Sequence, residues 1–185
     1  MKKQILRSPL FYVGDKYKLM EEIGTYFPAN IDKFIEPFVG GGSVFMNTVA
    51  EQFFLNDIDS YIIELHKYLC KAANRKKVFF ADLEAIIKEY GLSYSCKEDT
   101  IPTELKRRYK KTYFAKYNKE AYEQMRTDFN ESSKDNMSIL YLLLIYGFNR
   151  MLRFNKSGDF NLPVGNVDFN SNVASALEDY FLEVK

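Results

Sequence analysis

Two short apolar segments on either side of a glycine turn constrain the fold of this chain most. The first, Lys33 to Phe38, leads into three consecutive glycines at positions 40–42. A helical pattern begins at Ser43, which can cap the helix. Glu51 to Leu55 then has the character of a second strand, which ends at Asn56-Asp57. Strand, glycine turn, helix, strand and acid in this order are typical of a βαβ nucleotide-binding unit.

The glycine turn also excludes two common nucleotide sites. Gly40 and Gly42 fit the first two places of the dinucleotide fingerprint, but Phe45 puts a large ring where the helix must pack on the strand. No Gly-Lys-Ser/Thr follows the glycines, so the turn is not a P-loop. The remaining candidate ligand is a nucleoside that the turn does not hold through a phosphate. Asp57 can accept hydrogen bonds from ribose hydroxyls, and Glu36 can receive an ammonium or another donor. The alternative is a plain strand-to-helix turn.

The rest of the chain is predominantly helical by apolar spacing. The expected helices are 18–26, a helix from Ser60 through Cys70, 79–90, 104–126, 137–146 and 173–182. We expect Gly91 to end the helix 79–90, and either Ser171 or Asn172 to cap the start of the last helix. The all-apolar segment 137–146 predicts a buried helix. Turn residues 155–159 between two short segments, 150–154 and 160–164, predict a β-hairpin.

Composition decides which partners remain. A chain of 185 residues with 46% hydrophobic residues forms one domain, or one domain with a small insertion. Its net charge of +1 gives no global basic field, so any nucleic-acid signal is local. The basic, tyrosine-rich segment 104–126 is one such signal; a solvated helix face is the alternative.

Metal and membrane sites are not expected. The two cysteines and the single histidine have no metal-ligand spacing, so we predict no metal site. Two unpaired thiols suit a reducing cytoplasm, where we expect the protein to act. The longest apolar segment, 139–146, is too short to span a bilayer, and the N-terminus lacks a signal-peptide pattern.

Four ordered segments carry a resemblance to a known family. They are Ser8–Lys16 (SPLFYVGDK), Ile35–Gly42 (IEPFVGGG), Asn56–Asp59 (NDID) and Phe148–Gly165 (FNRMLRFNKSGDFNLPVG). In this order the chain resembles DNA adenine-N6 methyltransferases of the Dam type, the α group. The last segment is the most specific, because glycine turns occur in many folds.

The resemblance implies a cofactor, a partner and a reaction. The cofactor is S-adenosylmethionine, and the matching cofactor-binding positions are Tyr12, Lys16, Glu36, Phe38, Gly40, Gly42 and Asp57. The partner is double-stranded DNA, and the matching DNA-binding positions are Phe148, Asn149, Arg153 and Asn155. The family extrudes adenine from the duplex and transfers a methyl group to N6, in restriction-modification systems or phages. Arginine and asparagine suit guanine and adenine edges, and a phenylalanine can wedge between bases.

The implied fold is α/β. Residues 1–66 would form the N-terminal part of an incomplete Rossmann-like S-adenosylmethionine-dependent methyltransferase sheet. Residues 67–165 would form an inserted helical target-recognition domain with a hairpin at 150–164, and residues 166–185 would return toward the catalytic half. An incomplete sheet is expected to leave an open edge and an uncovered apolar face.

Two departures from the family qualify these expectations. The cofactor loop has Gly14-Asp15-Lys16 where the family usually has Gly-Gly-Lys or Gly-Asn-Lys. The catalytic tetrapeptide, Asp or Asn followed by Pro-Pro and an aromatic residue, is absent, since none of the five prolines are adjacent. We therefore predict no catalytic residue and no methyl transfer by this chain alone. It would be a truncated product, a fragment, or half of a split enzyme that needs a second polypeptide. The alternatives are a non-catalytic DNA-binding module and a subunit that supplies cofactor site and recognition.

Overall fold

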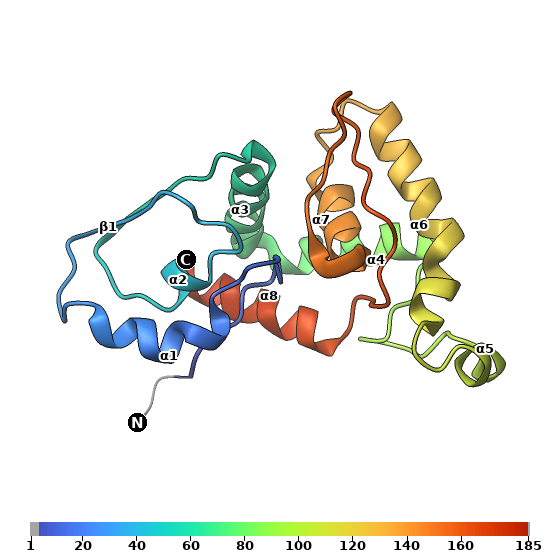
Figure 1. Cartoon of the computed structure of the whole chain (residues 1–185), viewed down its shortest axis with the longest axis horizontal. Coiled ribbons are helices and arrows are strands. Elements are labelled where there is room, and N and C mark those ends of the chain that lie inside the picture. The colour runs from blue at the N-terminus through green and yellow to red at the C-terminus, as the bar shows by residue number, and fades with distance from the viewer. Residues whose placement is uncertain (1–3, 185) are drawn as a thin grey trace.

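The computed structural model describes residues 4–184, with a small sheet at one end of the molecule and a group of helices at the other (Figure 1). Strands β1 (Lys33–Glu36) and β2 (Gln52–Leu55) are parallel, and Lys33 pairs with Gln52 and Glu36 with Leu55. The short helix α2 (Ser43–Met46) lies in the connection between them. The predicted βαβ unit is therefore confirmed.

The helical segment before the sheet consists of three consecutive short turns: η1 (Tyr17–Leu19), α1 (Met20–Ile23) and η2 (Gly24–Tyr26). The helices after the sheet are α3 (Ser60–Ala72), η3 (Ala73–Arg75), α4 (Lys76–Tyr90), α5 (Thr103–Arg108), α6 (Tyr113–Glu131), α7 (Met137–Tyr146), η4 (Phe148–Arg150) and α8 (Ser171–Glu183). Helix α7 packs against α3, α4 and α6, and its residues 140–146 are fully buried, as its apolar sequence predicts.

One face of the two-stranded sheet is uncovered. Ile35 and Phe54 pair across the strands and point to the same face, where they are 67% and 50% exposed. On the other face Phe34 and Phe53 pack together, with ring centroids 5.8 Å apart. The uncovered apolar face expected of an incomplete sheet is thus present.

The basic helix predicted over 104–126 is two helices, α5 and α6, with a break at 109–112. The side chain of Asn166 accounts for the break. Its Nδ2 donates to the Lys111 carbonyl at 2.8 Å, and its Oδ1 accepts from the Ala115 amide at 3.2 Å. A residue about fifty positions away therefore satisfies backbone groups that a continuous helix would have paired internally.

Helix caps also differ from the expectations. Ser43 does not cap α2; Gly42 occupies the N-cap in a left-handed conformation. The last helix is capped by Asn170, whose side chain accepts from the amides of Asn172 and Val173, and not by Ser171 or Asn172. Gly91 ends α4 with φ +73°, as predicted.

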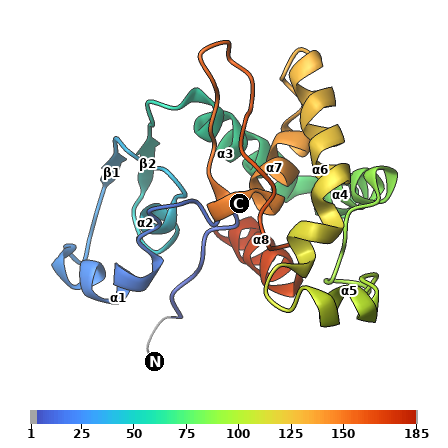
Figure 2. The same ribbon diagram turned by 45° about the vertical axis from the view of Figure 1, so that its right-hand side comes forward.

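The predicted hairpin at 150–164 is an extended loop without continuous strands (Figure 2). The backbones of its two sides pair at isolated antiparallel bridges, Phe154 with Phe160 and Gly147 with Val164. The side chain of Asn130 in α6 holds the outer edge of this loop. Its Oδ1 accepts from the Phe160 amide at 2.7 Å, and its Nδ2 donates to the Phe160 carbonyl at 2.9 Å. These Phe160 groups face away from Phe154, because the two residues form a pair flanked by the bonds from Asn155 to Asp159 and from Asn161 to Arg153.

The boundary expected at residues 66 and 67 lies inside helix α3, and a single apolar core includes residues from both sides of it. The division of the chain into 1–66, 67–165 and 166–185 stays a prediction. No helix in the described part of the chain is long and apolar enough to cross a membrane. Cys70 and Cys96 are both free thiols, as expected.

Candidate functional site

The glycine turn between β1 and α2 has a backbone that only glycine adopts easily. Gly40 and Gly42 have φ of +45° and +85°. A Cβ on Gly42 would lie 2.4 Å from the Phe45 ring and 2.8 Å from the His66 ring. The turn is closed by a 2.8 Å hydrogen bond from the Gly42 amide to the Val39 carbonyl. Phe45, which broke the dinucleotide pattern, therefore packs directly beneath the turn.

A cavity of about 370 Å³ lies between this turn and the loop at residues 12–16. Six of the seven predicted cofactor-binding residues line it: Tyr12, Lys16, Glu36, Phe38, Gly40 and Gly42. Phe38 is 81% exposed at its rim. Phe45 does not line this cavity. The structure thus brings together two segments that are distant in sequence, and leaves the space between them open.

Asp57, the seventh residue, does not line the cavity but holds the turn that does. Its Oδ2 accepts from the Gly40 amide at 2.9 Å, and its Oδ1 accepts from the Asp59 amide at 3.0 Å. Burial, and then the negative charges of Asp59 and Asp57, raise the pKa of the half-buried Tyr12 hydroxyl. Tyr12 therefore lies close enough to sense both carboxylates at the end of β2.

Glu36 is the buried acid of the cavity, with 9% of its surface exposed. Its Oε2 accepts a hydrogen bond from the Phe45 amide at 3.2 Å. Burial raises the pKa of Glu36 to about 7, although the Phe45 hydrogen bond acts in the opposite direction. This carboxyl group consequently changes charge near neutral pH, and a cation beside it would favour its ionised form.

The unusual Asp15 of the loop connects the two walls of the cavity. Its carboxylate accepts from the Tyr17 amide at 2.8 Å and from the Ser43 hydroxyl at the start of α2. Lys16 is exposed, and its ammonium donates to the Gly14 carbonyl at 2.6 Å. Asp15, which departs from the family pattern, therefore links the loop to α2 through hydrogen bonds. The neighbouring Lys16 side chain extends into solvent.

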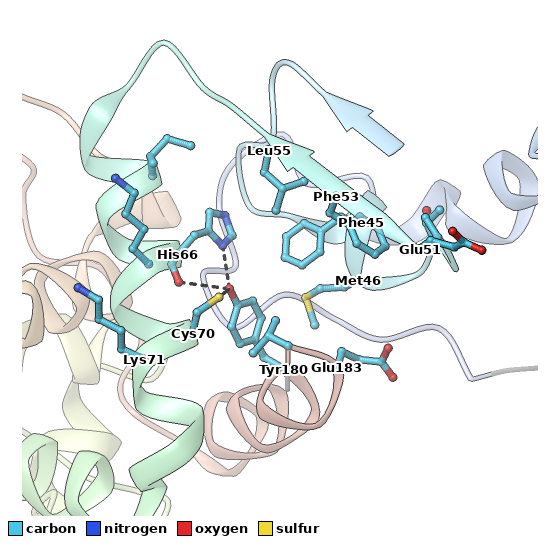
Figure 3. Close-up of a pocket in the computed structure, with 15 residues that line it drawn as sticks. Phe45, Met46, Glu51, Phe53, Leu55, His66, Cys70, Lys71, Tyr180 and Glu183 are labelled. Atoms are coloured by element: carbon cyan, nitrogen blue, oxygen red, sulfur yellow. Dashed lines mark hydrogen bonds between the residues drawn. The ribbon is translucent and has the colours of Figure 1, made fainter. Parts of the chain in front are cut away.

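His66 is a functional candidate that the sequence reasoning missed. Its Nε2 lies 2.9 Å from the Gly40 carbonyl, and its Nδ1 lies 3.2 Å from the Tyr180 hydroxyl (Figure 3). Burial lowers the pKa of His66, so the ring is neutral. The consistent arrangement has Nε2–H donating to Gly40 and the Tyr180 hydroxyl donating to Nδ1. The signal was its place on the apolar face of α3, beside Ile62 and Leu69.

A second, apolar cavity of about 740 Å³ lies on the other side of the glycine turn (Figure 3). Phe45, Phe53 and Leu55 line it from the sheet side. His66 and Tyr180 also line it, from α3 and α8. His66 therefore lines this cavity and bonds to the glycine turn, and Tyr180 bonds to the His66 ring.

The predicted DNA-binding residues lie on the extended loop and just before it. Phe148 is 52% exposed, and Asn149 has φ +54°. The Arg153 side chain is exposed and is held across the loop, because Nε donates to Asn161 Oδ1 at 2.8 Å and Nη2 donates to the Asn161 carbonyl at 2.6 Å. Its guanidinium is thus positioned before any ligand arrives.

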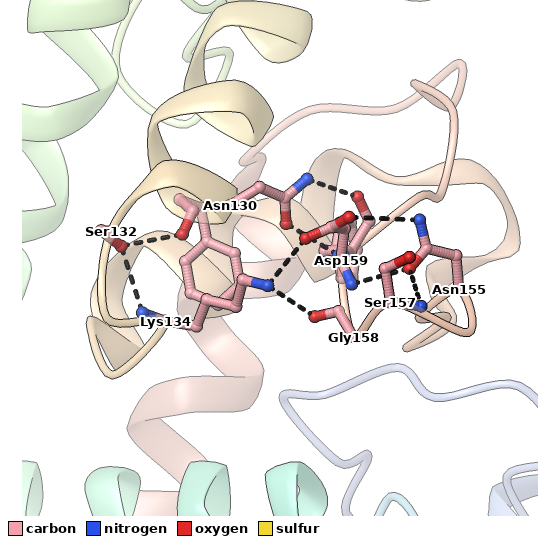
Figure 4. A network of polar contacts seen from close by, with 9 residues as sticks. Asn130, Ser132, Lys134, Asn155, Ser157, Gly158 and Asp159 are labelled. Carbon is pink, nitrogen blue, oxygen red and sulfur yellow. Dashed lines mark hydrogen bonds and ion pairs between the residues drawn. The ribbon is translucent and has the colours of Figure 1, made fainter.

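The tip of the loop is fixed by side chains, including the fourth predicted residue. Asn155 Oδ1 accepts from the amides of Ser157 and Asp159, each at 2.9 Å. Lys134, in the connection between α6 and α7, donates to the Gly158 carbonyl at 2.9 Å and pairs with Asp159 at 2.7 Å (Figure 4). Asn155 therefore has a structural task at the turn, and its predicted contact with DNA stays a prediction.

Within residues 4–184 no group of three or more His, Cys, Asp or Glu side chains is arranged to hold a metal ion.

Comparison with known proteins identifies the family. The chain is 32% identical over 160 residues to the Type II methyltransferase M.FokI of Planomicrobium okeanokoites, and the match covers 86% of this chain and 21% of that protein. It is 30% identical over 185 residues to the modification methylase StsI of Streptococcus sanguinis, covering 99% and 24%. It is 32% identical over 167 residues to the DNA adenine methylase of Escherichia coli K12, covering 89% and 49%.

The chain thus spans between about a fifth and about half of the length of these relatives. Residues 12–183 match the family described as D12 class N6 adenine-specific DNA methyltransferase. That match takes in the cavity, the glycine turn and the extended loop, and so the chain belongs to this family of adenine-specific DNA methyltransferases.

Proposed function

We propose that the cavity between the loop 12–16 and the glycine turn binds S-adenosylmethionine. The observation that carries this proposal is the glycine turn. Its left-handed glycines, Gly40 and Gly42, expose their backbone to the cavity, and Glu36 adds a buried carboxyl group. A volume of about 370 Å³ is in the range of small-molecule sites. Glu36 would take the ammonium of the cofactor, Lys16 its carboxylate, and the unused lone pairs of Asp57 its ribose hydroxyls.

The rest of the chain would recognise double-stranded DNA. Phe148 is exposed and free to stack, Arg153 is pre-positioned, and Asn149 and Asn155 lie on the same loop segment. Residues 67–165 would act as the target-recognition domain, with the extended loop 150–164 as the part that enters the duplex. Arginine is the commonest reader of guanine, and each such pair contributes about 1–3 kcal/mol of discrimination.

The reaction would be methylation of adenine N6, for which bound S-adenosylmethionine supplies the methyl group. The adenine N6 lone pair is delocalised, so carbonyl or carboxylate oxygens must accept the N6 hydrogens. The family tetrapeptide that does this is absent from the sequence. A polypeptide that carries it, as a continuation of this sequence or as a separate chain, would complete the enzyme and cover the sheet face at Ile35 and Phe54.

Calorimetric titration with S-adenosylhomocysteine tests the cofactor site. We expect saturable binding by the wild-type chain and a loss of at least about tenfold in Asp57→Ala, which frees the Gly40 amide. Asp32→Ala, which removes an exposed carboxylate just before β1, is the matched control and should bind normally. Saturable binding that Asp57→Ala leaves intact would contradict the site, provided that thermal melting shows both variants folded.

A tritiated-methyl transfer assay on duplex DNA tests the missing catalytic group. The purified 185-residue chain should transfer no methyl group, although it binds cofactor and DNA. Turnover by this chain alone would show that the tetrapeptide is not needed. DNA binding without any cofactor binding would instead favour a non-catalytic DNA-binding module.

A further inference from the structure

Two arginines that are distant in sequence meet on one buried ring. The guanidinium carbon of Arg7 lies 4.5 Å from the centroid of Phe11, and that of Arg150 lies 4.3 Å from the same centroid. All three residues line a cavity of about 420 Å³, together with Phe148 and Asn149. None of the three belongs to the cofactor-binding or DNA-binding sets described above.

This pair of positive charges has no counter-ion in the described part of the chain. The ion pairs among residues 4–184 include neither arginine. The Nε of Arg150 is buried and has no hydrogen-bond acceptor there. Burial, and the nearby charge of Arg7, lower the pKa of Arg150, while Tyr141 and the Asp168 charge act in the opposite direction. Asp168 is already occupied by Ser95, whose amide and hydroxyl donate to it at 2.8 Å.

The backbone around the cluster is strained. Phe11, Asn149 and Arg150 have φ of +48°, +54° and +49°, a region that residues other than glycine adopt at a cost. Such residues persist where the surrounding structure enforces them, and they gather at functional sites. The Arg150 carbonyl also accepts from the Val13 amide at 3.3 Å, so the cluster is fixed to the loop that walls the cofactor cavity.

We infer that Arg7 and Arg150, held on the ring of Phe11, bind a phosphodiester of the DNA. An unpaired, partly buried guanidinium is stabilised by an anion, and guanidiniums match phosphate oxygens in charge and geometry. The cluster lies between the predicted base-contacting residues Phe148 and Asn149 and the cofactor loop. A phosphate held there fixes the register of the duplex relative to both. The inference rests on the proposed DNA binding.

The salt dependence of DNA binding tests it. Arg7→Gln and Arg150→Gln should each weaken binding equally for specific and scrambled duplexes. Each should also reduce the slope of log affinity against log salt by part of about 0.9, the value for one phosphate, and the double variant Arg7→Gln/Arg150→Gln should reduce it by the whole amount. Between about 50 and about 200 mM salt, wild type should therefore lose about 3.5-fold more affinity than the double variant. Arg150→Lys should keep the slope. Arg75→Gln removes an exposed arginine beyond α3 and should change nothing.

The outcomes separate this inference from the proposed function. Unchanged slopes in both glutamine variants overturn it and leave DNA binding standing. Loss of base discrimination without a change of slope also overturns it, because base contacts would then explain the effect. If the wild-type chain binds no duplex, the proposed function fails and so does the assignment to DNA. In that case a titration with inorganic phosphate, monitored through the NMR signal of the Arg150 Nε–H, shows whether the cluster binds an anion other than DNA. Arg7 is exposed, so its variant stays informative if Arg150→Gln unfolds.

Discussion

The charge of Glu36 should control cofactor affinity. The pKa of this carboxyl group is about 7 in the free protein, because the side chain is buried. At about pH 5.5 it is ionised in roughly 3% of molecules, and at about pH 7 in roughly half. An ammonium bound beside the carboxylate lowers its pKa, so binding of S-adenosylhomocysteine should release a proton. If the bound pKa falls well below about 5.5, affinity should increase by up to about sixteenfold between these two pH values.

A bound pKa of about 6 would reduce that gain to roughly fourfold, which is still measurable. Over this range the ligand's own α-amino group stays charged, because the carboxylate beside it keeps the pKa of its ammonium well above neutral pH. Calorimetry at several pH values, in buffers of different ionisation enthalpy, measures both the affinity and the released proton. Glu36→Gln should bind with the same affinity at all of them, since glutamine keeps an acceptor for the Phe45 amide but does not titrate. Methylthioadenosine, which lacks the amino-acid tail, is the matched ligand control and should show no such gain.

The same carboxyl group affects stability with the opposite trend. Its pKa is raised in the folded protein, so the folded state holds a proton that the unfolded state has released. The free energy of unfolding should therefore fall as pH rises from about 4.5 to about 7, by up to about 3 kcal/mol from this group. Glu36→Gln should remove this part of the pH dependence.

A pH profile of cofactor binding in Glu36→Gln that matches the wild type would refute the assignment of Glu36 to the ammonium.

Three further perturbations follow from the contacts. Gly42→Ala places a Cβ 2.4 Å from the Phe45 ring at positive φ, so thermal melting should show that the free energy of unfolding falls by more than about 2 kcal/mol. Gly14→Ala has positive φ but open space around its Cβ, and should lower that free energy by about 1 kcal/mol. Asn130→Ala removes both partners of one backbone residue in the extended loop and should cost about 1–3 kcal/mol in denaturant unfolding, with faster amide exchange confined to that loop. Arg153→Ala should reduce discrimination between specific and scrambled duplexes by about 1–3 kcal/mol in mobility shifts, whereas Lys156→Ala should leave discrimination intact.

Local patterns predicted the elements whose cause is local. The parallel strands follow from short apolar segments around a glycine turn, and α7 follows from ten residues without a solvated face. Gly91 ends its helix because glycine adopts the left-handed conformation at no steric cost. The residues that line the cavity between the loop 12–16 and the glycine turn were equally accessible, because the motifs of the family resemblance include Tyr12, Lys16 and the turn residues.

The break between α5 and α6 has a distant cause, the side chain of Asn166. The outer edge of the extended loop is likewise held by a distant side chain, that of Asn130. The sequence shows both as ordinary polar residues, since propensity does not record which backbone a side chain will reach. Asp57 was predicted to face a ligand, yet its first contacts are with the amides of Gly40 and Asp59. A carboxylate at the end of a strand can serve both purposes, because each oxygen has two lone pairs.

Hydrogen bonds join the loop 12–16 and the glycine turn to neighbouring elements. The loop 12–16 bonds to η4 through Val13 and Arg150, and it bonds to α2 through Asp15 and Ser43. The glycine turn is held by Asp57 on one side and by His66 on the other. The walls of this cavity are therefore attached to the sheet end through Asp57, and to helical segments through His66 in α3 and Arg150 in η4. If DNA displaces η4, the hydrogen bond from Val13 to Arg150 should move the loop 12–16 with it. The affinities for cofactor and for DNA should therefore be coupled even where no residue contacts both ligands.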